Sequence, residues 1–361
     1  MKAGDFLRLL DRLAPFSLAL DWDNSGLQCG DPERPVARVA VCLDPTSEAI
    51  GKALDLGAEL LIAHHPLIFK PMKSLAAGSP QTDALVRAIK ADLPVISVHT
   101  NWDASGMCPA LADLLEVRAE GFLEPVSADY LKIVVFVPPE SFPDVSEALF
   151  GAGAGHIGGY SRCSFRSDGL GGFLPPPDGS PFIGEAGLYT ETREQRVEAI
   201  LPARFRDRCA EAVRRSHPYE EPAFEFHRVE ATGAYGFGIR GKWDPPREPL
   251  PWTASRLGTP FLTHAGPLPA RASRVALLPG SGASFLPQAK AAGCEILITG
   301  DLTHHQALLA EELGVGVIAA GHMETELPGC ERLMQELKAM APAEEFFLIG
   351  GESPMPVWRA P

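Results

Sequence analysis

Short continuous apolar runs and longer stretches with helical spacing follow one another along much of the chain. The run Leu60–Ala63, bounded by a glutamate and by a His-His-Pro sequence, has the length and continuity of a buried parallel strand. The same pattern predicts, around this run, a helix at Asp5–Leu13, a strand at Val36–Leu43, helices at Thr46–Leu56 and Thr82–Ala91, and a strand at Pro94–Val98. This order of strands and helices with short links predicts a parallel sheet that helices cover on both faces.

A different pattern occupies residues 125–236. It predicts strands at Leu131–Val137, Phe182–Gly187, Glu194–Leu201 and Ala223–Val229, helices at Phe142–Phe150 and Ala203–Arg215, and a glycine-rich stretch at Gly151–Gly172. Two strand-helix-strand units of this size are typical of an α+β domain of the ferredoxin-like kind. We therefore predict a discontinuous α/β metal-binding domain, residues 1–124 and 237–361, and an inserted α+β domain, residues 125–236.

The alternating pattern resumes after a proline-rich and glycine-rich segment, Gly236–Ala272, which we expect to be irregular with short strands. The pattern then predicts strands at Arg274–Leu278, Glu295–Ile298, Gly316–Ala320 and Phe346–Ile349, and helices at Ala283–Ala292, around His304 and His305, and at Cys330–Met340. The predicted fold class is α/β, a mostly parallel sheet covered by helices, with an inserted α+β ferredoxin-like domain.

Four of the apolar strands end in histidines or carboxylates. In open α/β sheets ligands bind outside the carboxyl ends of the strands, so we expect these side chains to converge. In chain order they are His64 and His65, His99 to Asp103, Asp301, and His322 with Glu326. His322 and Glu326 lie four residues apart, and in a helix they would share one face.

Three imidazoles and two carboxylates exceed the needs of one tetrahedral site that also keeps a water. Two divalent ions that share a bridging carboxylate would use all five ligands, His64, His65, Asp103, His322 and Glu326. Imidazole with carboxylate suits zinc, iron, manganese or nickel. The competing interpretation is a set of scattered structural histidines.

Other polar residues near these strand ends have two interpretations each. Asp301 and His305 are candidates for an acid or base, or for orienting a ligand, but Asp301 could instead cap a helix and His305 could be solvated. His99 is a further ligand or a hydrogen-bond partner of one. The turn Gly280–Ala283 could cradle a phosphate, and a plain connection is the alternative.

Composition and charge exclude several classes of protein. A net charge of −14 argues against a nucleic-acid partner bound through its phosphates. No apolar stretch is long enough for a membrane span, and Met1–Leu20 lacks the core of a signal peptide. The seven cysteines form no Cys-x-x-Cys pair, which indicates reduced thiols in a cytoplasmic protein.

The chain resembles the GTP cyclohydrolase 1 type 2 family, also called Nif-3-like, over nearly its whole length. The motifs that carry the resemblance are Trp22–Leu27, His64–Leu67, His99–Asp103, Thr299–Asp301, and Gly321-His322 with Glu326. Gly155–Tyr160 and His217–Ala223 resemble the inserted domain of the longer members, which is similar to the PII and CutA folds. One departure is Gly106–Pro109, where the family has a Gly-Gly-x-Asn turn.

The resemblance implies a dinuclear metal site at His64, His65, Asp103, His322 and Glu326, a homohexamer, and a small-molecule substrate such as a nucleotide. It also implies a metal-dependent hydrolase that opens the guanine ring of GTP with release of formate. Hydrolysis of another phosphorylated metabolite stays open, as does a non-enzymatic role in metal binding, metal delivery or regulation. The same ligands would serve each of these functions.

Overall fold

The fold is described from a computed structural model. The structure describes residues 1–76, 78–126, 129–157, 160–230, 235–259 and 261–350. The chain divides into two compact units, one formed by Met1–Val126 with Ala234–Pro361 and the other by Ser127–Gly233. Among the described residues, no helix combines the length and apolar character needed to cross a membrane.

The first unit contains a five-stranded sheet in the order β1-β4-β3-β2-β15, in which only β1 is antiparallel to its neighbour. Its strands are β1 (Gly26–Cys29), β2 (Arg38–Cys42), β3 (Leu60–Ala63), β4 (Val95–Ser97) and β15 (Glu345–Ile349). Leu60 and Ile62 pack in one buried cluster and Leu61 and Ala63 in another. The run is continuously apolar because helices cover both faces of the sheet.

Two pairs of helices cover the two faces of this sheet. On one face lie α1 (Ala3–Leu13) and α11 (His322–Met340), and on the other α2 (Ser47–Asp55) and α3 (Pro80–Lys90). Thr46 caps α2 and Ser79 caps α3, each accepting a hydrogen bond from a backbone N–H of the first turn. The helices and strands predicted here are confirmed, and α11 extends the predicted Cys330–Met340 helix back to His322.

The first unit also contains a six-stranded sheet, so it has two sheets where the pattern predicts one. Its order is β11-β14-β13-β12-β10-β5, with β12, β13 and β14 parallel and the other pairs antiparallel. Its strands are β5 (Arg118–Val126), β10 (Tyr235–Arg247), β11 (Thr263–Ala265), β12 (Ala272–Leu277), β13 (Ile296–Thr299) and β14 (Gly316–Ala319). The chain is thus a mixed α/β protein with several sheets.

The helices of this part are α8 (Pro249–Leu257), α9 (Leu286–Ala291), which follows the 3-10 turn η5 (Gly282–Phe285), and α10 (His304–Leu313). The prediction of an irregular Gly236–Ala272 segment with short strands holds for the short strand β11, but it was wrong for most of the long strand β10 and for α8. Glycines in β10 break the apolar pattern that would have predicted a strand. One of them, Gly236, is required by close packing, because a Cβ there would collide with Phe122 of β5.

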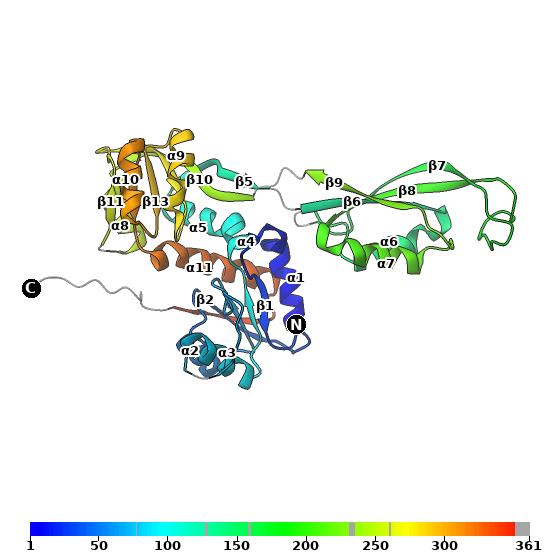
Figure 1. Cartoon of the computed structure of the whole chain (residues 1–361), viewed down its shortest axis with the longest axis horizontal. Helices are drawn as coiled ribbons and strands as arrows, with labels where there is room; N and C mark the ends of the chain where they lie inside the picture. The colour runs from blue at the N-terminus through cyan, green and yellow to red at the C-terminus, as the bar shows by residue number, and fades with distance from the viewer. Residues whose placement is uncertain (77, 127–128, 158–159, 231–234, 260, 351–361) are drawn as a thin grey trace, which may run out of the picture. The chain divides into compact units, whose positions relative to one another are not determined.

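One interrupted helix lies beside α11, which runs between the two sheets (Figure 1). It consists of α4 (Thr100–Trp102), the π-helical turn η2 (Asp103–Met107) and α5 (Cys108–Leu114). Trp102 Nε1 donates to the carbonyl of Gly329 in α11 at 3.1 Å, and a Cβ at Gly106 would collide with the Trp102 ring. The π-helical turn therefore contains Gly106 and Met107 of the atypical Gly106–Pro109 sequence, whereas Cys108 and Pro109 begin α5. Such π-helical turns are frequent at functional sites.

The second unit has a four-stranded antiparallel sheet in the order β7-β8-β6-β9. Its elements are β6 (Asp129–Val137), η3 (Pro139–Ser141), α6 (Phe142–Gly151), β7 (Phe165–Phe173), β8 (Thr190–Pro202), η4 (Ala203–Phe205), α7 (Arg206–Ser216) and β9 (Phe224–Glu230). Strand β7 was missed, because its mostly exposed, glycine-rich sequence has no apolar alternation. The predicted strand at Phe182–Gly187 was wrong, since Gly184 and Gly187 have φ of 85° and 78°.

Two motifs of this unit were singled out in the sequence. His217 lies in a turn, where its Nε2 is 2.9 Å from the carbonyl oxygen of Phe136 and its Nδ1 accepts from the backbone N–H of Tyr219. These two contacts give His217 a structural role in the turn. Of the Gly155–Tyr160 motif, Gly158 and Gly159 lie outside the described residues.

Candidate metal centre

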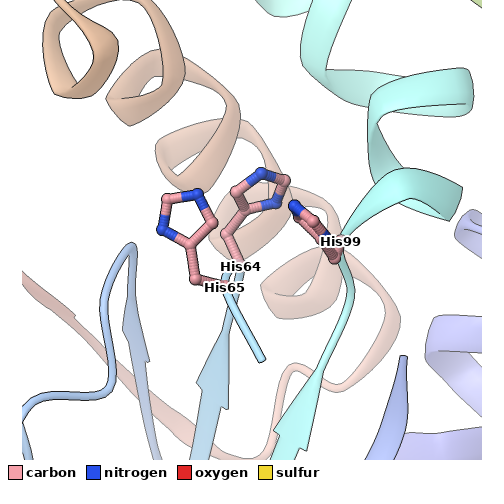
Figure 2. A group of neighbouring side chains, drawn as sticks. All are labelled: His64, His65 and His99. Atoms are coloured by element: carbon pink, nitrogen blue, oxygen red, sulfur yellow. The ribbon is translucent and has the colours of Figure 1, made fainter. Parts of the chain in front are cut away.

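Three imidazoles meet at the carboxyl ends of β3 and β4. His64 and His65 follow β3 directly, and His99 follows β4 after one residue. The register pairs Ala63 with Ser97, so the two strands end side by side. The ring centroids lie 4.9 Å apart for His64 and His65, 5.2 Å for His64 and His99, and 5.5 Å for His65 and His99. Figure 2 shows the three rings gathered beyond the strand ends.

The other half of the cluster comes from α11, which follows β14. His322 and Glu326 lie one turn apart on the same helix face, as predicted, and His322 Nε2 is 3.1 Å from Glu326 Oε2. The same carboxylate oxygen is 3.4 Å from His65 Nε2. Ligands from the strand ends of both sheets therefore meet around Glu326.

Asp103 enters from the π-helical turn. Its Oδ1 lies 3.6 Å from His64 Nε2, and Glu326 Oε1 lies 3.9 Å from the same nitrogen. Two groups of side chains have ligand atoms close enough to hold a metal ion, His64 with His65 and His99, and His65 with His322 and Glu326. The structure thus brings together every residue that the sequence singles out as a metal ligand, with His99 beside them.

Each of the four imidazoles is held through its Nδ1 atom. This nitrogen is 2.9 Å from the Val98 carbonyl oxygen in His64, and 2.7, 2.9 and 2.6 Å from a carboxylate oxygen of Asp44, Asp23 and Asp301 in His65, His99 and His322. Partners of this kind fix the tautomer and the orientation of metal-binding histidines. The Nε2 atoms are left for the ligand.

Asp44 was not predicted from the sequence, and Asp23 entered only as part of the Trp22–Leu27 motif. Asp44 follows β2 by two residues, at the same sheet edge as His64 and His65. The strand-end rule would have found it if it had been applied to β2. Asp23 gave no such signal, because its chain segment precedes β1 and reaches His99 only through the fold.

The charge state of His64 is set by its burial. The side chain is 1% exposed, and burial lowers its pKa to about 3. Because Nδ1 donates to a carbonyl, Nε2 of this neutral ring carries a lone pair, and this lone pair faces the oxygens of Asp103 and Glu326. Although it is buried, His64 Nε2 has no hydrogen-bond partner among the described residues. A buried lone pair that faces carboxylate oxygens fits a bound cation.

Three other side chains of the cluster have raised pKa values, and each shift favours the protonated form. Burial raises the pKa of Asp103 to about 7. Burial disfavours a charged His65, but Asp44 and Glu326 outweigh it and raise its pKa to about 10. Glu326 itself raises the pKa of His322 to about 9, against burial. For Glu326, burial opposes ionisation, yet His322 and His65 hold its pKa below the usual range.

The two acid or base candidates, Asp301 and His305, have different surroundings. Asp301 Oδ2 also accepts from Ser281 Oγ at 2.8 Å, and Thr303 caps α10, so Asp301 is not the cap of that helix. His305 is exposed on the first turn of α10, and its described ring contact is with His304. The Gly280 turn lies against the cluster, since a Cβ there would collide with Glu326 Oε1.

The fold and this cluster define a mixed α/β protein with a histidine and carboxylate site that could hold metal. The model of the Duf34/NIF3 (NGG1p interacting factor 3) family matches residues 1–351, and the chain belongs to this family. The resemblance found in the sequence motifs is thereby confirmed.

Individual relatives cover most of the chain. The GTP cyclohydrolase 1 type 2 homolog of Mycobacterium tuberculosis is 36% identical over 351 residues, which is 94% of this chain and 92% of the relative. The protein of that name from Halalkalibacterium halodurans is 34% identical over 88% of this chain and 87% of its own length. The crystal structure of a Bacillus cereus protein related to NIF3 matches with a TM-score of 0.78 and 30% identity, covering 99% of each chain.

Substitution of the residue that holds His65 tests the role of the Nδ1 partners. In Asp44→Ala the His65 ring loses its fixed orientation, and we expect zinc affinity to fall roughly 10- to 100-fold. Zinc titration against a competing chelator measures the change. Asp55→Ala, which removes an exposed carboxylate at the end of α2, is the matched control and should bind zinc as the natural chain does. Equal affinity in both variants would contradict the assignment.

Gly280→Ala tests the packing of the turn against Glu326. Gly280 and Gly258 have φ of 59° and 67°, so alanine strains the backbone similarly at both positions, by roughly 1–2 kcal/mol. Only at Gly280 does the new methyl group meet a site carboxylate, whereas nothing lies within 4 Å at Gly258. We expect both variants to lose similar stability in thermal unfolding, and Gly280→Ala alone to lose bound metal by mass spectrometry. Full metal content in Gly280→Ala would show that Glu326 tolerates displacement.

Proposed function

We propose that this chain is a metal-dependent hydrolase that opens the guanine ring of GTP and releases formate. The observation that carries the proposal is the buried, unprotonated His64 Nε2, which faces carboxylate oxygens of Asp103 at 3.6 Å and Glu326 at 3.9 Å. A divalent cation would resolve this contact between like partial charges. The name GTP cyclohydrolase 1 type 2 homolog, which the relatives carry, supplies the reaction.

Two ions fit the division of the ligands better than one. The two candidate groups share His65, and the two oxygens of Glu326 face different imidazoles, Oε1 toward His64 and Oε2 toward His65 and His322. In this proposal Glu326 would serve both positions, His64, His99 and Asp103 would complete one, and His65 and His322 would complete the other. Zinc, iron, manganese and nickel suit this mixture of imidazole and carboxylate.

Ions at these positions would polarise the substrate and lower the pKa of water. The reaction consumes two waters: one adds at C8 and the C8–N9 bond breaks to leave a formamide, and the second releases formate from the amine. Of the two acid and base candidates, the geometry favours Asp301 over His305. Asp301 Oδ2 lies 2.6 Å from His322 Nδ1, so a proton leaving that nitrogen would reach this oxygen.

Two further properties belong to the proposal. The second unit follows the order strand-helix-strand-strand-helix-strand with the sheet order β7-β8-β6-β9, which supports a ferredoxin-like module of the PII and CutA kind. The family resemblance supports assembly into a homohexamer. Sedimentation equilibrium of the full chain tests this assembly, and we expect the mass of six chains; a monomer would contradict it.

Formate release is the direct test of the reaction. Protein reconstituted with zinc, iron, manganese or nickel should release formate from GTP, and a chelator should abolish the release. His65→Ala should also abolish it, because His65 belongs to both ligand groups. His304→Ala, which removes an exposed imidazole on α10, is the control and should retain activity.

The alternative function gives a different result in the same assay. A non-enzymatic metal-binding or metal-delivery protein would bind two ions per chain and leave GTP unchanged. Bound metal with release of product from another phosphorylated metabolite would keep the hydrolase and replace the substrate. Absence of bound transition metal in protein purified without chelators would contradict both functions.

A further inference from the structure

Two large aromatic side chains lie exposed beside the candidate metal centre. Trp22 is 58% exposed and Phe69 is 45% exposed, whereas Trp102 and Trp243 are each 1% exposed. The Trp22 and Phe69 ring centroids are 5.9 Å apart, and they lie 5.8 and 6.3 Å from the His99 ring. His99 in turn is in ring contact with His64 and His65. Trp22 and Phe69 therefore contact His99, which itself contacts His64 and His65 of the ligand cluster.

Hydrogen bonds join the two segments that carry these rings. The Asn24 side-chain amide donates to the carbonyl of Ile68 at 2.6 Å, and the backbone N–H of Ile68 donates to Gln28 Oε1 at 3.1 Å. Both backbone groups of the residue before Phe69 are thus bonded to the segment that follows Trp22. This double contact fixes the two aromatic residues relative to each other.

The residue after Trp22 ties the same segment to the cluster. Asp23 Oδ1 is 2.9 Å from His99 Nδ1, and Asp23 Oδ2 accepts from the backbone N–H and the hydroxyl of Thr100 at 3.0 and 2.6 Å. The Asp23 side chain is fully buried. Trp22 is therefore anchored next to His99 through its neighbour, while its own ring stays open to solvent.

We propose that Trp22 and Phe69 form an aromatic wall that stacks the planar base of the substrate, a purine, beside the metal centre. Planar bases stack on aromatic rings with substantial affinity, and the exposed faces of Trp22 and Phe69 offer such a surface. The ligand cluster consists of imidazoles and carboxylates. The aromatic wall would add a large apolar face beside it. The choice of a purine rests on the proposed function.

Calorimetric titration of the metal-loaded full chain with guanosine 5′-monophosphate and with ribose 5-phosphate tests the wall. The natural chain should bind the nucleotide more tightly than the sugar phosphate. Trp22→Leu should weaken nucleotide binding roughly 5- to 100-fold and leave sugar phosphate binding unchanged. Phe69→Leu should weaken it less, since Phe69 is the smaller and less exposed ring, and Trp22→Phe should restore most of the affinity.

Tyr189→Leu, which removes an exposed aromatic of the second unit, is the matched control and should bind both compounds as the natural chain does. Metal content and sedimentation should be unchanged in every variant. Equal binding of the two compounds by the natural chain would overturn the proposal, as would unchanged nucleotide binding in Trp22→Leu. A change of assembly in Trp22→Leu would also overturn it, because the ring would then serve a contact between chains.

The same experiments separate this inference from the proposed reaction. Nucleotide binding that depends on Trp22, without formate release from GTP, would keep the aromatic wall and remove the hydrolase. Formate release with an unchanged KM in Trp22→Leu would keep the hydrolase and remove the wall.

Discussion

A buried carboxylate surrounded by imidazoles is the interaction on which the rest of this site depends. The Glu326 side chain is only 6% exposed, and an unpaired charge at such a position costs several kcal/mol. His65 and His322 compensate it directly, and they come from the strand ends of two different sheets. The rest of α11 packs Leu333 and Leu337 into the core of the five-stranded sheet, so the helix that carries Glu326 is held far beyond the site.

The imidazoles themselves are oriented before any ligand arrives. The contacts to Asp44, Asp23 and Asp301 come from three separate segments, and the fourth contact is to a backbone carbonyl. A site built in this way loses little conformational entropy on binding, because the side chains already occupy single orientations. Asp103 is also positioned by the backbone, because it begins the π-helical turn that interrupts the helix.

Local rules recovered much of this arrangement from the sequence. The continuous apolar run of β3 predicted a buried strand, and the four-residue spacing of His322 and Glu326 predicted a shared helix face, because both signals lie within one element. The division into two sheets was not predictable in this way. It depends on β10, which pairs with both β5 and β12, and whose glycines and prolines break any periodic signal. The Nδ1 partner of His99 was equally hidden, because Asp23 is 76 residues away in sequence.

The segment Trp22–Asn24 shows how much a short polar stretch can carry without a periodic pattern. Its three consecutive side chains go three ways: the Trp22 ring to solvent beside His99, the Asp23 carboxylate to His99 and Thr100, and the Asn24 amide to Ile68. An ordinary turn needs only suitable backbone geometry and polar residues. The side chains of this turn bind Ile68 in one segment and His99 and Thr100 in another, so these distant contacts fix its conformation. The Trp22 ring contacts Phe69 and His99 and is still 58% exposed, so a surface that a ligand can cover remains beside the cluster.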